Sequence, residues 1–119
     1  MEITNTILFI LMTVESGGNI HAVGDDGKAI GLYQIHAEYF QDASEHLCRN
    51  HPEVDLVYPY AAFNAVSSAY LVKAYMARYA TEERIGRPVT VEDICRIHNG
   101  GPNGYKKSST DATGRSARK

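Results

Sequence analysis

The sequence predicts a mainly helical α+β domain, in which a small β-hairpin lies beside a helical bundle. An almost continuous apolar run at residues 3–14, and spaced apolar residues in 37–47, 60–80 and 91–98, favour helices. A glycine-punctuated segment at residues 19–35 favours a short hairpin instead. The length of 119 residues, with 44% apolar and 22% charged residues, suits a single domain with one core.

The first predicted helix, residues 3–14, should be buried on most sides because nearly all of its residues are apolar. The sequence Ser-Gly-Gly at residues 16–18 ends this helix, since glycine leaves the helical conformation easily. In residues 19–35, the sequence GDDGK separates short apolar pieces. It therefore predicts the turn of a small, irregular hairpin.

Residues 37–47 are predicted as a second helix, because its apolar side chains fall on one face. Residues 60–80 are predicted as the longest helix, with apolar residues at spacings of three and four. The sequence RIGRP then breaks the helical pattern.

The last predicted helix follows Thr90, with Asp93 three residues later in an imperfect capping box. Asn-Gly-Gly-Pro at residues 99–102 stops it. Residues 108–119 contain no apolar residue beyond alanine, which is typical of a disordered polar tail. We therefore predict one catalytic domain over residues 1–107 and a tail over residues 108–119.

The charge distribution excludes some partners. The net charge is −2, with two basic and nine acidic residues in 1–60, and ten basic and five acidic residues in 61–119. The basic half is too sparse to predict nucleic-acid binding.

The apolar run at residues 7–12 is also too short to span a membrane. We expect a monomer.

The N-terminal segment does not predict an export signal. It carries Glu2 in place of a basic region and shows no small-residue cleavage site. We expect a protein made in the cytoplasm that reaches its target after lysis, injection or another kind of release.

The two cysteines, Cys48 and Cys95, allow at most one disulfide and are typical of a reducing compartment. Whether they pair is open from sequence. In the sequence HLCRNH, His46, Cys48 and His51 are three candidate metal ligands close together, without a clear fourth. We therefore predict neither a metal site nor a cofactor.

Glu15 follows the apolar run of the first helix. Apolar surroundings and the negative end of a helix dipole both disfavour the charged form of a carboxyl group, as general-acid catalysis requires. Asp25 and Asp26 lie in a polar turn, where a carboxylate stays ionised. Two carboxyl groups in different environments are typical of glycoside hydrolysis. A helix end followed by a plain Asp-Gly surface turn explains the same residues without chemistry.

These residues belong to a longer pattern. The sequence ESGGN, followed by AVGDDGKAIGLYQI, resembles the lysozyme-like superfamily, in which a catalytic Glu-Ser precedes a GLMQ-like motif. GDDGKAIGLYQI is similar to the goose-type version, while YMARYA and RIHNGGPNGYK resemble the invertebrate-type (destabilase) lysozymes. The similarity covers roughly residues 5–107 in consistent order. It implies a lysozyme-like fold.

The resemblance also implies roles for individual residues. Glu15 matches the general acid and Asp25 the second carboxylate, with Asp26 as a weaker candidate. The positions that match the sugar groove are Tyr33, Gln34, His98 and Asn99. Gln34 has a second interpretation, as a side chain that satisfies buried backbone groups. His98 also has a second interpretation, as a partner of the dipole at the end of its helix. Because the chain has no tryptophan, sugar stacking would fall to tyrosines. The open candidates are Tyr33, Tyr60 and Tyr105.

The function that this resemblance implies is a lysozyme, which hydrolyses the β-1,4 bond between N-acetylmuramic acid and N-acetylglucosamine in peptidoglycan. Chitin-type oligosaccharides are a further candidate substrate. A lytic transglycosylase, which uses Glu15 alone and forms 1,6-anhydro-muramyl products, is the nearest alternative. A sugar-binding module without activity is another. The segment between Glu15 and Asp25 is shorter than in either lysozyme group, so the carboxyl separation stays open. Retention needs ~5 Å and inversion ~6.5–9.5 Å.

Overall fold

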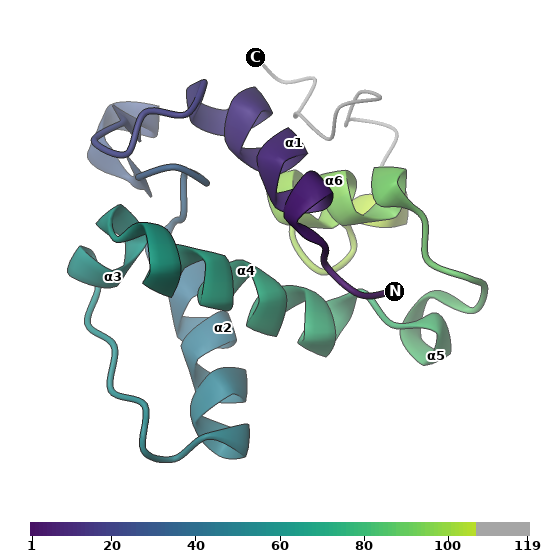
Figure 1. The fold of residues 1–119 in the computed structure, drawn as a ribbon. Coiled ribbons are helices and arrows are strands. Elements are labelled where there is room, and N and C mark those ends of the chain that lie inside the picture. The colour runs from purple at the N-terminus through teal and green to yellow at the C-terminus, as the bar shows by residue number, and fades with distance from the viewer. Residues whose placement is uncertain (107–119) are drawn as a thin grey trace. The chain divides into compact units, whose positions relative to one another are not determined.

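The computed structural model describes residues 1–106, which form two compact units (Figure 1). The larger unit comprises residues 4–75, and the smaller comprises residues 1–3 and those from 76 onward. The predicted tail at 108–119 lies outside the described residues, and a single catalytic domain over 1–107 stays a prediction. Within residues 1–106, no helix combines the length and apolar character that a membrane span requires. The mainly helical α+β fold class is confirmed, because the described residues form several helices and one two-stranded antiparallel sheet.

The larger unit begins with helix α1, Asn5–Ser16. The Thr4 hydroxyl accepts a hydrogen bond from the backbone N–H of Ile7, and Gly17 ends the helix in the left-handed conformation. The predicted helix is therefore confirmed, with a shift of two residues at each end. It is less enclosed than expected, since the Phe9 residue is 62% exposed while Ile7 and Leu11 are buried.

The predicted hairpin is confirmed and is very small. Strands β1, Val23–Gly24, and β2, Ala29–Ile30, pair antiparallel, with Val23 opposite Ile30. The three-residue turn Asp25–Gly27 joins them. A further isolated bridge links Ile30 to Ile35, so the chain folds back on the hairpin before the next helix starts.

Helix α2, Ala37–Asn50, matches its predicted start and runs three residues further. The prediction of one long helix over residues 60–80 is wrong. The structure divides that segment into α3, Tyr60–Phe63, and α4, Ala65–Tyr79. Asn64 lies between them in an extended conformation, and its side-chain oxygen accepts hydrogen bonds from the backbone N–H groups of Val66 and Ser67. Asparagine is among the strongest N-cap residues, so it starts a new helix where apolar spacing alone suggested continuity.

A glycine in the motif GLYQI sets the contact between the hairpin and α3. A Cβ atom at Gly31 would overlap the backbone carbonyl oxygen of Ala62, and Gly31 has a φ of 79°. Only glycine meets both conditions without strain. The Gly31 N–H donates to the Ala22 carbonyl oxygen at 2.8 Å, which closes the hairpin loop.

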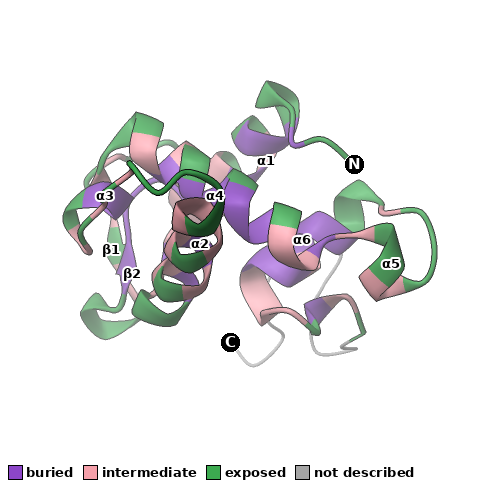
Figure 2. Cartoon of the chain, turned by 90° about the horizontal axis from the view of Figure 1, so that it is seen from below, coloured by how far each residue is buried: buried purple, intermediate pink, exposed green. Residues whose placement is uncertain are grey.

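The smaller unit contains a helix that the sequence pattern did not predict, α5, Glu82–Ile85. The Thr81 hydroxyl accepts from the Arg84 N–H at its start, and Gly86 ends it with a φ of 89°. Helix α6, Val91–Gly100, was predicted, and its core residues Ile94, Cys95 and Ile97 are buried (Figure 2). A 3-10 turn at Gly104–Lys106 follows.

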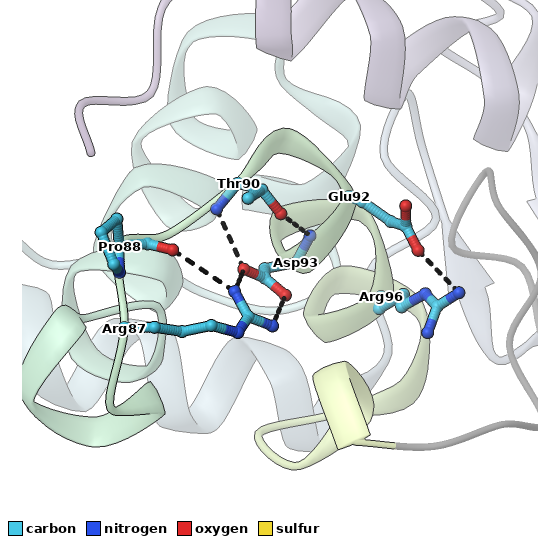
Figure 3. Close-up of polar contacts among 6 residues, drawn as sticks. All are labelled: Arg87, Pro88, Thr90, Glu92, Asp93 and Arg96. Atoms are coloured by element: carbon cyan, nitrogen blue, oxygen red, sulfur yellow. Dashed lines mark hydrogen bonds and ion pairs between the residues drawn. The ribbon is translucent and has the colours of Figure 1, made fainter.

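The capping box of α6 is complete, despite its aspartate. The Thr90 hydroxyl accepts from the Asp93 N–H, and the Asp93 carboxylate accepts from the Thr90 N–H (Figure 3). The same carboxylate forms two bonds to the Arg87 guanidinium, at 2.6 and 2.8 Å. These bonds from Arg87, opposed by burial and supported by Thr90, lower the pKa of Asp93 to about 2.

We expect Asp93→Asn to lower the free energy of unfolding by about 1–2 kcal/mol at neutral pH. Because the folded pKa lies below the ordinary value, the ionised Asp93 stabilises the protein above that value, and its contribution disappears as the pH falls through about 2. The difference between wild type and variant should therefore shrink between about pH 4 and pH 2. Urea denaturation across this range measures it.

Glu92→Gln is the matched control, because Glu92 pairs with Arg96 at 2.7 Å while its side chain is half exposed. Its effect should stay within about 0.5 kcal/mol. An Asp93→Asn difference that is constant with pH would show that the charge of Asp93 does not stabilise α6.

Candidate active site

Glu15 lies in the last turn of α1, as its place in the sequence predicted. The helix ends one residue later, at Ser16, and the N–H of the C-cap residue Gly17 donates to the Thr13 carbonyl oxygen at 3.1 Å. The Glu15 residue is half-buried at this carbonyl end of the helix.

A cluster near Glu15 consists of three tyrosines, Tyr33, Tyr39 and Tyr75. The rings of Tyr39 on α2 and Tyr75 on α4 are stacked, with centroids 3.7 Å apart and planes 9° apart. The pKa of Tyr39 is raised well above its ordinary value, first by burial and then by the charges of Tyr75, Glu15 and Tyr33. Helices α2 and α4 thus place a stacked pair of aromatic rings near the Glu15 carboxyl group.

Asp25 and Asp26 occupy the hairpin turn, both exposed and both with positive φ, at 48° and 57°. Gly27 continues the left-handed path at 89°. Aspartate tolerates this region better than most residues. The Lys28 N–H donates to the Asp25 carbonyl oxygen at 3.2 Å and closes the turn. The sequence prediction of a polar, solvated turn for these carboxylates is confirmed.

The structure distinguishes Asp25 from Asp26 by its partner. The Oδ2 atom of Asp25 lies 2.9 Å from Nε2 of His36, and each side chain is about one third exposed. Sequence analysis did not single out His36. The signal that could have found it is its place directly after the GLYQI motif and before α2.

The side chain of Gln34 forms hydrogen bonds inside the hairpin loop. It has a φ of 52°, and its side-chain nitrogen donates to the carbonyl oxygens of Ala22 at 3.3 Å and Gly31 at 3.0 Å. Its oxygen lies against Gly24, where a Cβ atom would collide with it. Gln34 thus satisfies backbone groups at both ends of the loop. Neighbouring Tyr33 is 5% exposed, and burial raises the pKa of its hydroxyl. Sugar contacts for both residues stay predictions.

His98 and Asn99 belong to the smaller unit, in the last turn of α6. His98 is buried. Asn99 is half-buried, and its side-chain oxygen is shielded from solvent with no hydrogen-bond partner among the described residues. An acceptor in this condition costs free energy unless another group satisfies it. Contact with a sugar stays a prediction for both residues.

The tyrosines considered for sugar stacking differ in exposure. Tyr60, the first residue of α3, is 74% exposed, whereas Tyr105 is half-buried under the Arg84 guanidinium in the smaller unit. Tyr60 therefore offers a free ring face, and Tyr105 offers less of one.

The sequence HLCRNH does not assemble into a metal centre in the described chain. Among residues 1–106, no three histidine, cysteine or acidic side chains have the arrangement that holds a metal ion. Both cysteines are free thiols, and the Cys48 thiol donates to the Val54 carbonyl oxygen at 3.3 Å. His51 lines an apolar cavity of about 440 Å³ with six other residues. They are Leu47, Val54, Leu56, Val66, Ser67 and Tyr70.

The mainly helical fold thus places a glutamate at the end of α1 and an aspartate on the hairpin turn. Residues 4–118 match the destabilase family, and the chain belongs to that family. It is 36% identical to lysozyme 1 of Crassostrea virginica over 72% of this chain and 41% of that protein. It is 30% identical to a lysozyme of Magallana gigas over 91% of this chain and 73% of that protein.

Two solved structures share the fold. The Meretrix lusoria lysozyme, in complex with Aeromonas hydrophila PliI, superposes with a TM-score of 0.73 at 28% identity. That match covers 92% of this chain and 84% of the other. Tapes japonica lysozyme superposes with a TM-score of 0.70 at 30% identity, over 88% and 80% of the two chains. The predicted lysozyme-like fold, with invertebrate-type resemblance, is confirmed.

Proposed function

We propose that the protein hydrolyses the β-1,4 bond between N-acetylmuramic acid and N-acetylglucosamine in peptidoglycan. The observation that carries this proposal is the pair of carboxyl groups in contrasting environments within the larger unit. Glu15 is half-buried at the negative end of α1, and Asp25 is solvated on the hairpin turn. Membership of a family with lysozyme relatives supports the same chemistry.

Glu15 is the general acid in this proposal. Its protonated carboxyl group donates to the glycosidic oxygen as the bond breaks. Glu15 lies at the carbonyl end of α1, and its charge acts on the Tyr39 hydroxyl of the nearby tyrosine cluster.

Asp25 is the second carboxylate. It acts as nucleophile, as stabiliser of the positive charge on the sugar, or as the base that activates water. All three roles need the ionised carboxylate, and Asp25 is solvated and contacts His36. Tyr33 and Gln34 in the larger unit are proposed to contact sugars, as are His98 and Asn99 in the smaller unit.

Product analysis tests the proposal directly. Purified peptidoglycan is digested with the wild-type protein, and the product masses are measured. Hydrolysis gives fragments with a free reducing muramic acid. Fragments lighter by one water, with a 1,6-anhydro-muramyl end, would instead show a lytic transglycosylase. Binding without any products would show a sugar-binding module.

A further inference from the structure

We propose that His36 is a positioning residue that holds the Asp25 carboxylate in its working orientation. This inference rests on the proposed role of Asp25 as the second carboxylate. The observation behind it is the 2.9 Å contact between Nε2 of His36 and Oδ2 of Asp25. The two residues are eleven positions apart in sequence, so the contact joins the hairpin turn to the start of α2.

The turn needs such a contact because its own backbone holds it weakly. Asp25, Asp26 and Gly27 have three consecutive positive φ angles, and all three are exposed. A left-handed conformation costs an L-residue on the order of 1 kcal/mol, so the turn is easily displaced. A misplacement of a catalytic group by ~1 Å can lower a rate by about 10²-fold. A side-chain contact that fixes the position of the Asp25 carboxylate should therefore raise the catalytic rate.

His36 is a firm anchor, because its backbone is held on both sides. The preceding residue, Ile35, is fully buried and exchanges two backbone hydrogen bonds with Ile30, at 2.9 and 3.2 Å. The Ile35 carbonyl oxygen also accepts from the Tyr58 hydroxyl at 3.0 Å. The His36 carbonyl oxygen accepts from the Phe40 N–H in the first turn of α2.

The imidazole is not used as a helix cap. His36 occupies the N-cap position of α2, yet its side chain makes no capping hydrogen bond. The ring turns toward Asp25 instead. A serine or aspartate at this position would favour the helix start more strongly, so the histidine gives up local helix stability for its contact with the turn.

Three variants test this inference on soluble peptidoglycan fragments. His36→Ala removes the donor, and we expect kcat to fall about 10-fold or more, with KM within about 2-fold. His36→Gln places an amide N–H at a similar reach and should recover most of kcat at neutral pH.

His51→Gln is the matched control, because His51 pairs with Glu53 at 3.7 Å on an exposed loop. It should leave kcat and KM unchanged. A wild-type rate in His36→Ala, while Glu15→Gln and Asp25→Asn are inactive, would overturn the role of His36 alone. An equal, unrescued loss in both His36 variants with a lowered Tm would assign it to folding instead. Activity that survives Glu15→Gln would overturn the proposed function itself.

Discussion

Glu15→Gln should lower kcat for peptidoglycan hydrolysis by about 10³-fold, with little change in KM. The glutamine amide keeps the shape of the side chain but cannot supply the proton that the leaving oxygen needs. Initial rates on soluble peptidoglycan fragments measure the effect. Tm values of both proteins show whether the fold is intact.

The same substitution should leave the protein as stable as the wild type, or more stable by about 0.3–1 kcal/mol. A negative charge at the end of α1 opposes the helix dipole, and the neutral amide removes that conflict. A variant that gains stability while it loses activity would identify a residue kept for chemistry rather than for folding. Glu83→Gln, at an exposed position in the first turn of α5, is the control: it should keep the rate and gain no stability, because a negative charge there agrees with the helix dipole. A Glu15→Gln protein that retains its rate would exclude Glu15 as the acid.

Local sequence signals predicted most of the fold. The end of α1 at Gly17, the hairpin turn and the capping box at Thr90 all depend on residues within four positions of each other. The break at Asn64 was missed because an apolar pattern continued across it. The short helix α5 was missed because its four residues are too few to show the helical period of apolar residues.

The candidate site was predicted less completely, because its contacts are distant in sequence. Contrasting surroundings in the sequence indicated Glu15 and the neighbouring pair Asp25 and Asp26 as candidates, and the family resemblance favoured Asp25. It did not identify His36, whose importance depends on a hydrogen bond across eleven residues. The inward contacts of Gln34 also depend on a backbone with positive φ, which no periodicity reveals.

Asp25→Asn should lower kcat for hydrolysis by about 10²–10³-fold. This substitution removes the charge of the side chain and keeps its shape. Asparagine tolerates the left-handed conformation that Asp25 adopts, and its side-chain oxygen can still accept from Nε2 of His36. The turn should therefore keep its shape while the carboxylate can no longer stabilise positive charge on the sugar. Initial rates and product masses, measured together, test this expectation.

Asp26→Asn provides a control within the same turn. Both aspartates are exposed and left-handed, but the contact with His36 belongs to Asp25. We expect Asp26→Asn to keep kcat within about 2-fold of the wild type. A reversed result would make Asp26 the second carboxylate. If Asp25→Asn stays active and forms anhydro-muramyl ends, one glutamate performs both proton transfers, because an internal hydroxyl replaces water and no second carboxylate is needed. The two neighbouring substitutions thus separate hydrolase from transglycosylase by a change of charge alone.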